Sequence, residues 1–80
     1  MNIVLYGPAS KSDRSHVVTI LLKHYPKANI ELLERSPTAK ECHNYNLVVY
    51  LGLDQVTGSN IDYRETRSVP YAQFEEWLLS

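Results

Sequence analysis

Cysteine is almost absent from the sequence: Cys42 is the only one in 80 residues. An intrachain disulfide is therefore excluded, whereas small secreted domains usually carry several to stabilise a weak core. Long apolar runs are absent as well. None approaches the roughly 20 residues that span a bilayer, and the N-terminal run is short and lacks the basic start of a signal peptide. These absences predict a cytoplasmic protein with no membrane segment.

A surplus of charge of one sign is also missing. Eight Lys and Arg residues and nine Asp and Glu residues give a net charge of −1. Nucleic-acid binding normally requires a basic face, so DNA or RNA is not indicated as a partner. The hydrophobic fraction of 44% is ordinary for a globular protein. We expect a single domain over residues 1–80, and because a chain this short buries only about 60% of its unfolded surface, it needs a well-filled core or a partner.

Glycine and cysteine are missing from a position where many α/β proteins carry their chemistry. Residues 3–6 form an apolar, β-favouring run, and residues 7–15 connect it to a helical pattern. A P-loop requires a second glycine before Lys-Ser/Thr, and a dinucleotide fingerprint requires three glycines. Redox domains carry Cys-x-x-Cys at this position, and open-sheet phosphatases carry one cysteine. The sequence therefore contains no recognisable catalytic motif, identifies no family, predicts no cofactor and favours a non-enzymatic role.

The apolar pattern predicts a strand–helix–strand start. Ser10 with Asp13 three residues later is a plausible helix cap, and Pro26 ends the helix. Residues 28–33 and 47–51 are interpreted as the second and third strands, so that the first 33 residues form a βαβ unit. The apolar stripe of this helix recurs at spacings of three and four: Val17, Val18, Leu21, Leu22 and Tyr25.

The second half of the chain is harder to interpret. Ser36-Pro37 predicts the start of a short helix over residues 38–45. Residues 57–60 form a turn signal that permits a hairpin, whereas residues 53–69 also fit an irregular loop followed by an edge strand at 66–69. A C-terminal amphipathic helix then closes the chain, with one apolar face of four residues: Tyr71, Phe74, Trp77 and Leu78.

Two architectures fit this order of elements. The first, which we favour, is a small α/β three-layer sandwich around a mostly parallel sheet of three to four strands, in the flavodoxin-like order 2-1-3-4. The second is a thioredoxin-like βαβαββα arrangement. They differ in whether the strand at residues 47–51 runs parallel or antiparallel to the first strand. The uniformly apolar character of that strand favours the parallel sheet.

The loop after the first strand is the best candidate for a ligand site. In open α/β sheets, ligands collect beyond the carboxyl ends of the strands, where the next helix presents free N–H groups. Hydroxyl and cationic side chains in this loop have the chemistry to hold a phosphate, a carboxylate or a nucleotide. The simpler interpretation is a capped helix start with solvated polar residues. The candidate ligand residues are Gly7, Ser10, Lys11, Ser12, Arg14 and Ser15.

The cysteine and the histidines do not form a recognisable metal or nucleophile pattern. His16 and His24 lie eight residues apart, over two helical turns, and so do not make a two-ligand clamp. Cys42 is followed by His43, but nothing in the sequence brings either of them to a distant partner. Because cysteine is among the most often buried residue types, we interpret Cys42 as a core or neutral surface residue and expect no metal site.

Aromatic residues are the abundant class, with six tyrosines, one tryptophan and one phenylalanine. Tyrosine and tryptophan are over-represented at binding interfaces because they combine a large area with a polar group and few rotors. We expect Tyr6, Tyr50, Phe74 and Trp77 to lie in the core. The segment around Arg64 alternates in charge, as an exposed edge strand does. The candidate interface residues are Tyr45, Tyr63, Arg64, Arg67 and Tyr71.

These observations favour a small, non-enzymatic binding protein that docks on another macromolecule, most plausibly a protein or a second copy of itself. Its size alone is typical of accessory proteins, adaptors and inhibitors, including those of phage. One alternative is a phosphate- or nucleotide-binding domain that uses residues 10–15. A second is a redox-type scaffold that lacks the catalytic cysteines.

Overall fold

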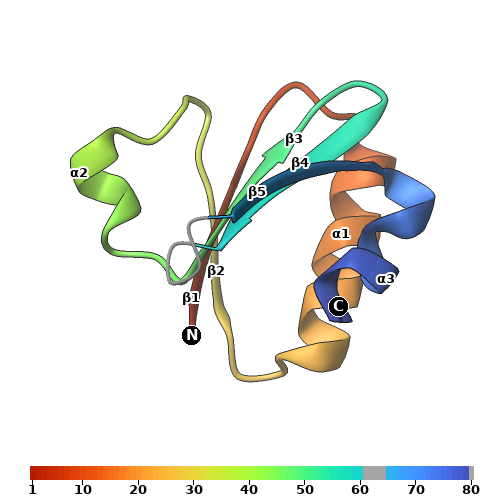
Figure 1. Cartoon of the computed structure of the whole chain (residues 1–80), viewed down its shortest axis with the longest axis horizontal. Helices are drawn as coiled ribbons and strands as arrows, with labels where there is room; N and C mark the ends of the chain where they lie inside the picture. Colours follow the sequence, from red (N-terminus) through yellow and green to blue (C-terminus); the bar gives the residue numbers. More distant parts are fainter. Residues whose placement is uncertain (61–64, 80) are drawn as a thin grey trace.

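A five-stranded mixed sheet runs through the centre of the domain in this computed structural model, which describes residues 1–60 and 65–79 (Figure 1). The strand order is β2-β1-β3-β4-β5. β1 pairs in parallel with both β2 and β3, whereas β4 is antiparallel to β3 and to β5. The strands are β1 (Asn2–Tyr6), β2 (Asn29–Leu32), β3 (Leu47–Leu51), β4 (Gln55–Asn60) and β5 (Glu65–Pro70).

The helices divide unequally between the two faces of the sheet. α1 (Lys11–His24) and α3 (Phe74–Leu79), the latter preceded by the short 3₁₀ turn η1 (Tyr71–Gln73), lie on one side, and α2 (Ala39–Cys42) lies on the other (Figure 1). None of the described helices has the length and apolarity to cross a membrane. Because α2 has only four residues, it covers only part of its side, and the third layer of the predicted sandwich is incomplete.

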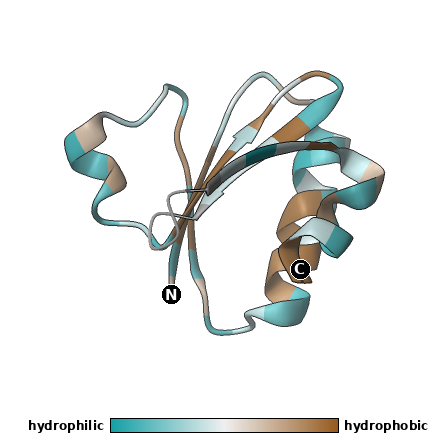
Figure 2. Cartoon of the chain, viewed as in Figure 1, coloured by the Kyte–Doolittle hydropathy of each residue, from teal (hydrophilic) through white to brown (hydrophobic). Residues whose placement is uncertain are grey.

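The hydrophobic core lies between the sheet and the pair α1 and α3, a side that we call the helix-covered face. Figure 2 shows apolar residues concentrated in the central strands and in the C-terminal half of α1. Alternate residues of each strand point into this core, as the two-residue period of a strand requires. The buried core residues of the strands and helices are Ile3, Leu5, Val17, Ile20, Leu21, Leu47, Val49, Leu51, Val56, Val69 and Phe74.

The predicted start of the chain is confirmed in its main features. The side chain of Ser10 accepts a hydrogen bond from the Asp13 N–H at 3.2 Å and caps α1, which ends before Pro26. The β1–α1–β2 unit forms, and β3 is parallel to β1 as favoured. The predicted stripe on α1 is wrong in one respect: Ile20 is buried, whereas Leu22 is 43% exposed.

The predicted sheet is wrong in size and partly in direction, because β4 and β5 add two antiparallel strands. The predicted order 2-1-3-4 is found for the first four strands and β5 follows at the edge, but the antiparallel β4 and β5 fit neither a mostly parallel sheet nor the thioredoxin-like arrangement. The turn signal at residues 57–60 belongs to β4 itself. A glycine is required at position 58 because the Trp77 ring of α3 packs directly against its backbone, and a Cβ there would stand 2.0 Å from that ring. The connection between β4 and β5 falls at residues 61–64, outside the described residues.

The start of the second helix also differs from the prediction. Its cap is Thr38, whose hydroxyl accepts from the Glu41 N–H while the Glu41 carboxylate accepts from the Thr38 N–H. This reciprocal pair is a capping box, a stronger local signal than Ser36 before a proline.

Candidate binding face

The side of the sheet opposite α1 and α3 carries two tyrosines on adjacent strands. Tyr6 of β1 and Tyr50 of β3 are register partners, and their ring centroids lie 5.2 Å apart with a 56° angle between the planes. Tyr50 is 38% exposed and Tyr6 is half-buried, so the expectation that both belong to the core is wrong. Val4 and Val48 lie two residues earlier on the same side of the sheet, and both are buried. Residues on both faces of β1 and β3 are therefore buried near the amino ends of these strands, whereas near the carboxyl ends only the helix-covered face is buried.

Hydroxyl side chains continue this side of the sheet across β4 and β5. The Oγ atoms of Thr57 and Ser68 lie 2.7 Å apart, and the Thr66 hydroxyl donates to the Ser59 hydroxyl at 3.2 Å. Both are cross-strand register pairs. A hydroxyl donates one hydrogen bond and accepts two, so these contacts leave hydrogen-bonding capacity on the surface. We call this surface the tyrosine face, and it comprises Val4, Tyr6, Val48, Tyr50, Thr57, Ser59, Thr66 and Ser68.

Tyr50 stands where three hollows of the tyrosine face meet. One, of about 370 Å³, extends toward Arg35 and Ser36 of the β2–α2 loop. Another, of about 460 Å³, extends over the strand ends to Leu53, which is 74% exposed. The third, which we call the Tyr50 groove, measures about 270 Å³ and lies between α2 and β5. It is lined by Tyr6, Cys42, Val48, Tyr50, Thr57, Ser59 and Thr66.

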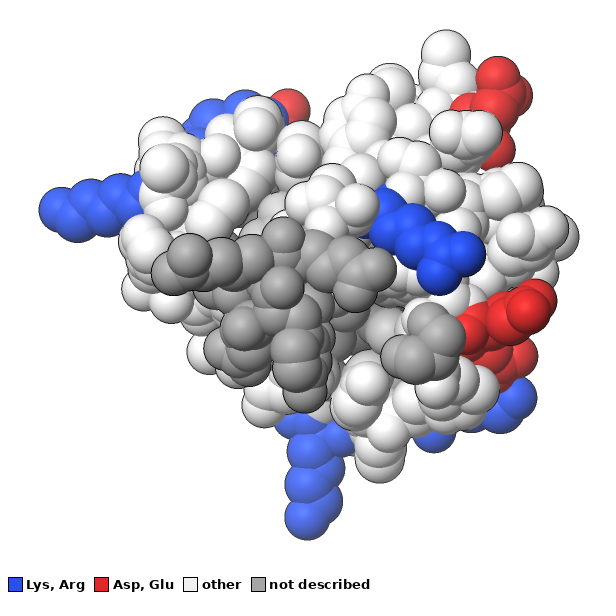
Figure 3. Space-filling view, viewed as in Figure 1, with Lys and Arg blue, Asp and Glu red and all other residues white. Residues whose placement is uncertain are grey.

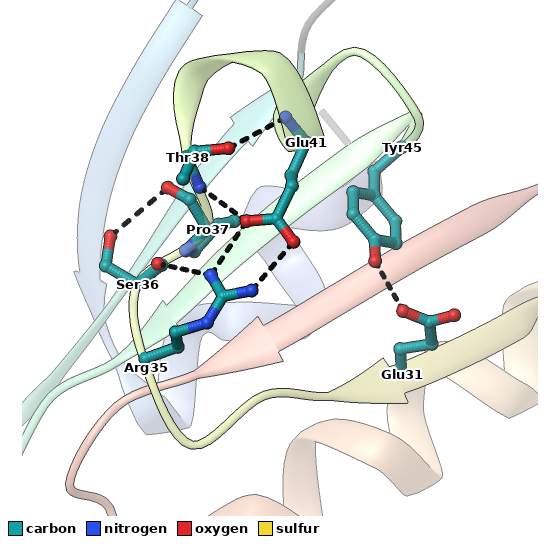
Figure 4. Close-up of polar contacts among 7 residues, drawn as sticks. All are labelled: Glu31, Arg35, Ser36, Pro37, Thr38, Glu41 and Tyr45. Atoms are coloured by element: carbon teal, nitrogen blue, oxygen red, sulfur yellow. Dashed lines mark hydrogen bonds and ion pairs between the residues drawn. The ribbon is translucent and has the colours of Figure 1, made fainter.

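A charged network holds α2 beside this face (Figure 4). The Arg35 guanidinium donates to both carboxylate oxygens of Glu41, at 2.7 and 2.8 Å. Hydrogen bonding from Arg35, followed by the hydrogen bond from the Thr38 backbone N–H, lowers the pKa of Glu41 to about 2. The Tyr45 hydroxyl donates to Glu31 of β2, which raises the pKa of Tyr45. A four-residue helix does not persist alone, so these contacts and the capping box position Cys42 at the wall of the groove.

The predicted ligand loop lies at the carboxyl ends of the strands, beside a cavity of about 430 Å³. Of its residues only Gly7 and Arg14 line that cavity, and the carboxylate-bearing Glu34 lines it too. Ser10 uses its hydroxyl as the cap of α1, and the remaining three are exposed on α1: Lys11, Ser12 and Ser15. The structure thus brings together two of the six predicted ligand residues.

Gly7 has a structural role that is independent of any ligand. Its φ of 128° lies in the region that favours glycine, and a Cβ would stand 2.3 Å from the Leu51 carbonyl oxygen. The chain passes directly over the end of β3 at this point, and the Ala9 N–H donates to the same oxygen at 3.2 Å.

The three predicted interface residues that the structure describes lie on different parts of the chain, before β3, on β5 and in η1. Tyr45 is bound to Glu31, and Arg67 is exposed on the edge strand β5. The Tyr71 hydroxyl donates to the Gly52 carbonyl at 2.6 Å, and burial, followed by the charge of Asp13, raises its pKa to about 12. Tyr63 and Arg64 lie outside the described residues. An interface at these positions stays a prediction.

Ionised side chains do not gather into a patch of one sign on the side that Figure 3 shows. Lys23 and His24 both contact Glu75, at 2.9 and 2.7 Å, and tie the end of α1 to α3. Among residues 1–60 and 65–79, no group of three or more His, Cys, Asp and Glu side chains is placed to hold a metal.

The tyrosine face was not among the site residues predicted from the sequence. Period-two alternation assigns Tyr6 and Tyr50 to the side opposite Leu5 and Val49, and the hydroxyl residues of β4 and β5 alternate with Val56 and Val69 in the same way. This alternation identifies the tyrosine face only when it is known which segments pair and which side of the sheet the helices cover.

Comparison with known proteins relates this chain to others by fold alone. No family model and no curated protein matches the sequence. Among solved structures, it is similar to prolyl-tRNA synthetase from Cryptosporidium parvum. The complex with halofuginone and AMPPNP aligns at a TM-score of 0.62 and 14% identity over 96% of this chain. The complex with L-proline and AMP aligns at 0.61 and 15% identity, also over 96%. The chain spans about a fifth of those proteins, 19% and 20%, and shares the fold of that part.

Proposed function

We propose that this chain is a non-enzymatic binding protein that docks on another protein through its tyrosine face. The observation that carries the proposal is the position of Tyr50, which is 38% exposed where three hollows meet on the sheet. Binding energy at protein interfaces concentrates in a few central aromatic residues, surrounded by a polar rim that excludes water.

The surroundings of Tyr50 fit such an interface. Tyr6 supports the Tyr50 ring from the neighbouring strand, so little side-chain entropy is lost when a partner covers it. The paired hydroxyls of β4 and β5 supply a polar border on one side. On the other side, the bidentate Arg35–Glu41 pair presents charges that already neutralise each other. These features favour contact with a largely neutral protein surface.

The described part of the chain offers less support for catalysis. Cys42 is half-buried at the wall of the Tyr50 groove, and no hydrogen bond in the described part joins it to a histidine. The His24 ring is hydrogen-bonded to the Glu75 carboxylate. A nucleophile acts with a base within hydrogen-bond reach, and this arrangement does not supply one.

Site-specific photocrosslinking in cells of the native host tests the docking proposal. Benzoylphenylalanine in place of Tyr50 should yield a discrete crosslinked protein, and the same reagent in place of Thr19, exposed on α1, should not. Excess unlabelled wild-type chain should abolish the product, whereas the Tyr6→Ala/Tyr50→Ala variant should compete poorly. Equal yields at both positions, or full competition by the variant, would overturn the proposal. A product of twice the chain mass would identify self-association.

One observation favours a second candidate, anion binding at the strand ends. Gly7 and Arg14 line the same cavity beside the start of α1, where backbone N–H groups favour negative charge. The similar synthetase structures hold AMPPNP or AMP, although this chain spans only a fifth of those proteins. Titration with inorganic phosphate and with AMP, followed by amide chemical shifts, separates the candidates. Saturable shifts confined to residues 7–15 and lost in Arg14→Ala would support an anion site.

A further inference from the structure

We infer that the Tyr50 groove receives one aromatic side chain of the docking partner, a tyrosine or a tryptophan, as the anchor of the interface. This inference rests on the docking proposal above and specifies the chemistry of the partner. The groove has an apolar floor of Val48 and the two tyrosines, a wall formed by Cys42 of α2, and a facing row of hydroxyls from β4 and β5.

The size of the groove fits a single ring. Its volume of about 270 Å³ falls just below the range of about 300–1,000 Å³ that is typical of sites for drug-sized ligands. An extended peptide or a dinucleotide therefore exceeds it, whereas one aromatic side chain fills it. The Tyr6 and Tyr50 rings, tilted at 56° to each other, both line the groove, so a third ring entering it meets aromatic surface. Tilted and offset ring pairs are the arrangements that aromatic groups prefer.

Charge selects against most other anchors. None of the described residues that line the groove is Lys, Arg, His, Asp or Glu. Among these described lining residues, a charged side chain entering the groove would find no counter-ion to replace the hydration that it loses, which is unfavourable. A neutral anchor avoids that cost, so the groove discriminates against the arginine, lysine and carboxylate anchors that other interfaces use.

The hydroxyl row selects among neutral anchors. Thr57, Ser59 and Thr66 stand along one side of the groove, and two of them already share a hydrogen bond with each other. Buried tyrosine O–H and tryptophan N–H groups need a hydrogen-bond partner, and a hydroxyl accepts two hydrogen bonds. A leucine or phenylalanine would fill the apolar part but leave the hydroxyls desolvated. Tyrosine and tryptophan satisfy both sides of the groove.

The test uses small neutral and charged analogues of single side chains on the full chain. N-acetyl-tryptophanamide and N-acetyl-tyrosinamide should cause saturable amide shifts at Cys42, Val48, Thr57 and Ser59, with a dissociation constant on the order of 1 mM. N-acetyl-leucinamide should bind more weakly. N-acetyl-argininamide should bind at least about tenfold more weakly than the aromatic amides.

Two variants provide the matched comparison. Ser59→Leu places a side chain inside the groove and should abolish the shifts caused by the aromatic amides. Thr19→Leu introduces the same side chain at an exposed position of α1, on the other side of the sheet (Figure 1) and outside the lining of the groove, and should leave them unchanged. Both variants are compared with the wild-type chain for melting temperature and for the spectrum of residues remote from the change, so that loss of fold is not mistaken for loss of binding.

Several outcomes would overturn the inference: no saturable shift with either aromatic amide, equal binding of the arginine amide, or tighter binding of uridine or adenosine. The last would assign the groove to a nucleobase. Crosslinking at the Tyr50 position that survives Ser59→Leu, without amide binding, would refute the aromatic anchor and leave the docking proposal standing. Amide binding without any specific crosslink would refute docking and leave an aromatic-ring site.

Discussion

The two faces of this sheet are built from the same strands and differ in what covers them. On the helix-covered face, α1 and α3 bury Leu5, Val49 and Phe74 completely or nearly so. On the tyrosine face, α2 is only a four-residue turn, and Tyr50 stays 38% exposed although Val4 and Val48 nearer the amino ends are buried. The buried residues of the first face therefore serve stability, whereas the second face leaves part of the Tyr50 ring open to solvent.

Truncating one aromatic residue on each face should show the largest difference. Phe74→Ala removes a fully buried ring and should lower the free energy of unfolding by about 3–5 kcal/mol. Tyr50→Ala should lower it by only about 1 kcal/mol, because much of that ring already contacts water. Urea denaturation followed by circular dichroism measures both. A Phe74→Ala chain without a cooperative transition would agree with the first value, and equal losses would remove the distinction between the faces.

Neighbouring residues of β4 sharpen the comparison within one strand. Gly58 lies under the Trp77 ring, and a Cβ there would approach it to 2.0 Å. Gly58→Ala should therefore cost about 1–3 kcal/mol through overpacking. Ser59→Ala, one residue along and on the tyrosine face, should cost about 0.5 kcal/mol or less. Thermal melts of the pair measure this. If Gly58→Ala melted like the wild-type chain, α3 would not be packed on β4 as described.

The capping box predicts a smaller and more local effect on α2. Thr38→Ala removes the hydroxyl that caps this helix and should cost about 1 kcal/mol of its local stability. Amide exchange at residues 39–42 should accelerate while exchange in the central strands stays unchanged. Ser36→Ala is the matched control, because Ser36 precedes the helix without capping it. Acceleration in both variants would show that the capping box does not hold α2.

The same network gives a pH dependence with a defined sign. The pKa of Glu41 falls from 4.5 to about 2 in the folded chain, chiefly through the hydrogen bond from Arg35. The contribution of the ionised Glu41 carboxylate to the stability of the folded chain is therefore fully present above about pH 4.5. It is lost as the pH falls through about 2. Amide shifts at residues 39–42 should titrate in that acid range and not near pH 4.5. Glu41→Gln should remove this titration.

The smallest effect on stability is expected at Leu53, which is 74% exposed beside Tyr50. Leu53→Ser should change the free energy of unfolding by no more than about 0.5 kcal/mol. It should nevertheless weaken competition for the crosslinked partner, because it removes apolar area from the hollow that Leu53 shares with Tyr50. A variant that competes as well as the wild-type chain would place Leu53 outside the interface.

Local signals in the sequence identified the first half of the fold. Ser10, the stripe through Val17 and Leu21, and Pro26 define α1, because caps, periodicity and proline act over a few residues. The same local reasoning failed at residues 57–60, where Gly58 signals a turn but is required by a ring nineteen residues later in the chain. The cap of α2 is likewise the Thr38–Glu41 capping box, whereas the Ser36-Pro37 signal lies just before the helix without capping it.

The candidate site was less predictable than the fold. A loop rich in serine and basic residues is an evident candidate from sequence, yet Ser10 is used as a cap, and Lys11, Ser12 and Ser15 do not reach the cavity that Gly7 and Arg14 line. Tyr6 and Tyr50 were assigned to the core because their strands are uniformly apolar. The burial of a strand residue depends on what packs against its side of the sheet, which is not a property of the strand.

The sequence by itself determined an α/β fold that begins with a βαβ unit and ends with an amphipathic helix, because each follows from caps, breakers and apolar periods within short segments. It favoured a parallel third strand without deciding the direction, which the pairing of β3 with β1 settles. Only the tertiary structure decided that β4 and β5 extend the sheet, and that both longer helices lie on one side of it. That asymmetry leaves Tyr50 exposed among hydroxyls and hollows. Such a surface arises from pairing between segments distant in the chain, and no local pattern specifies it.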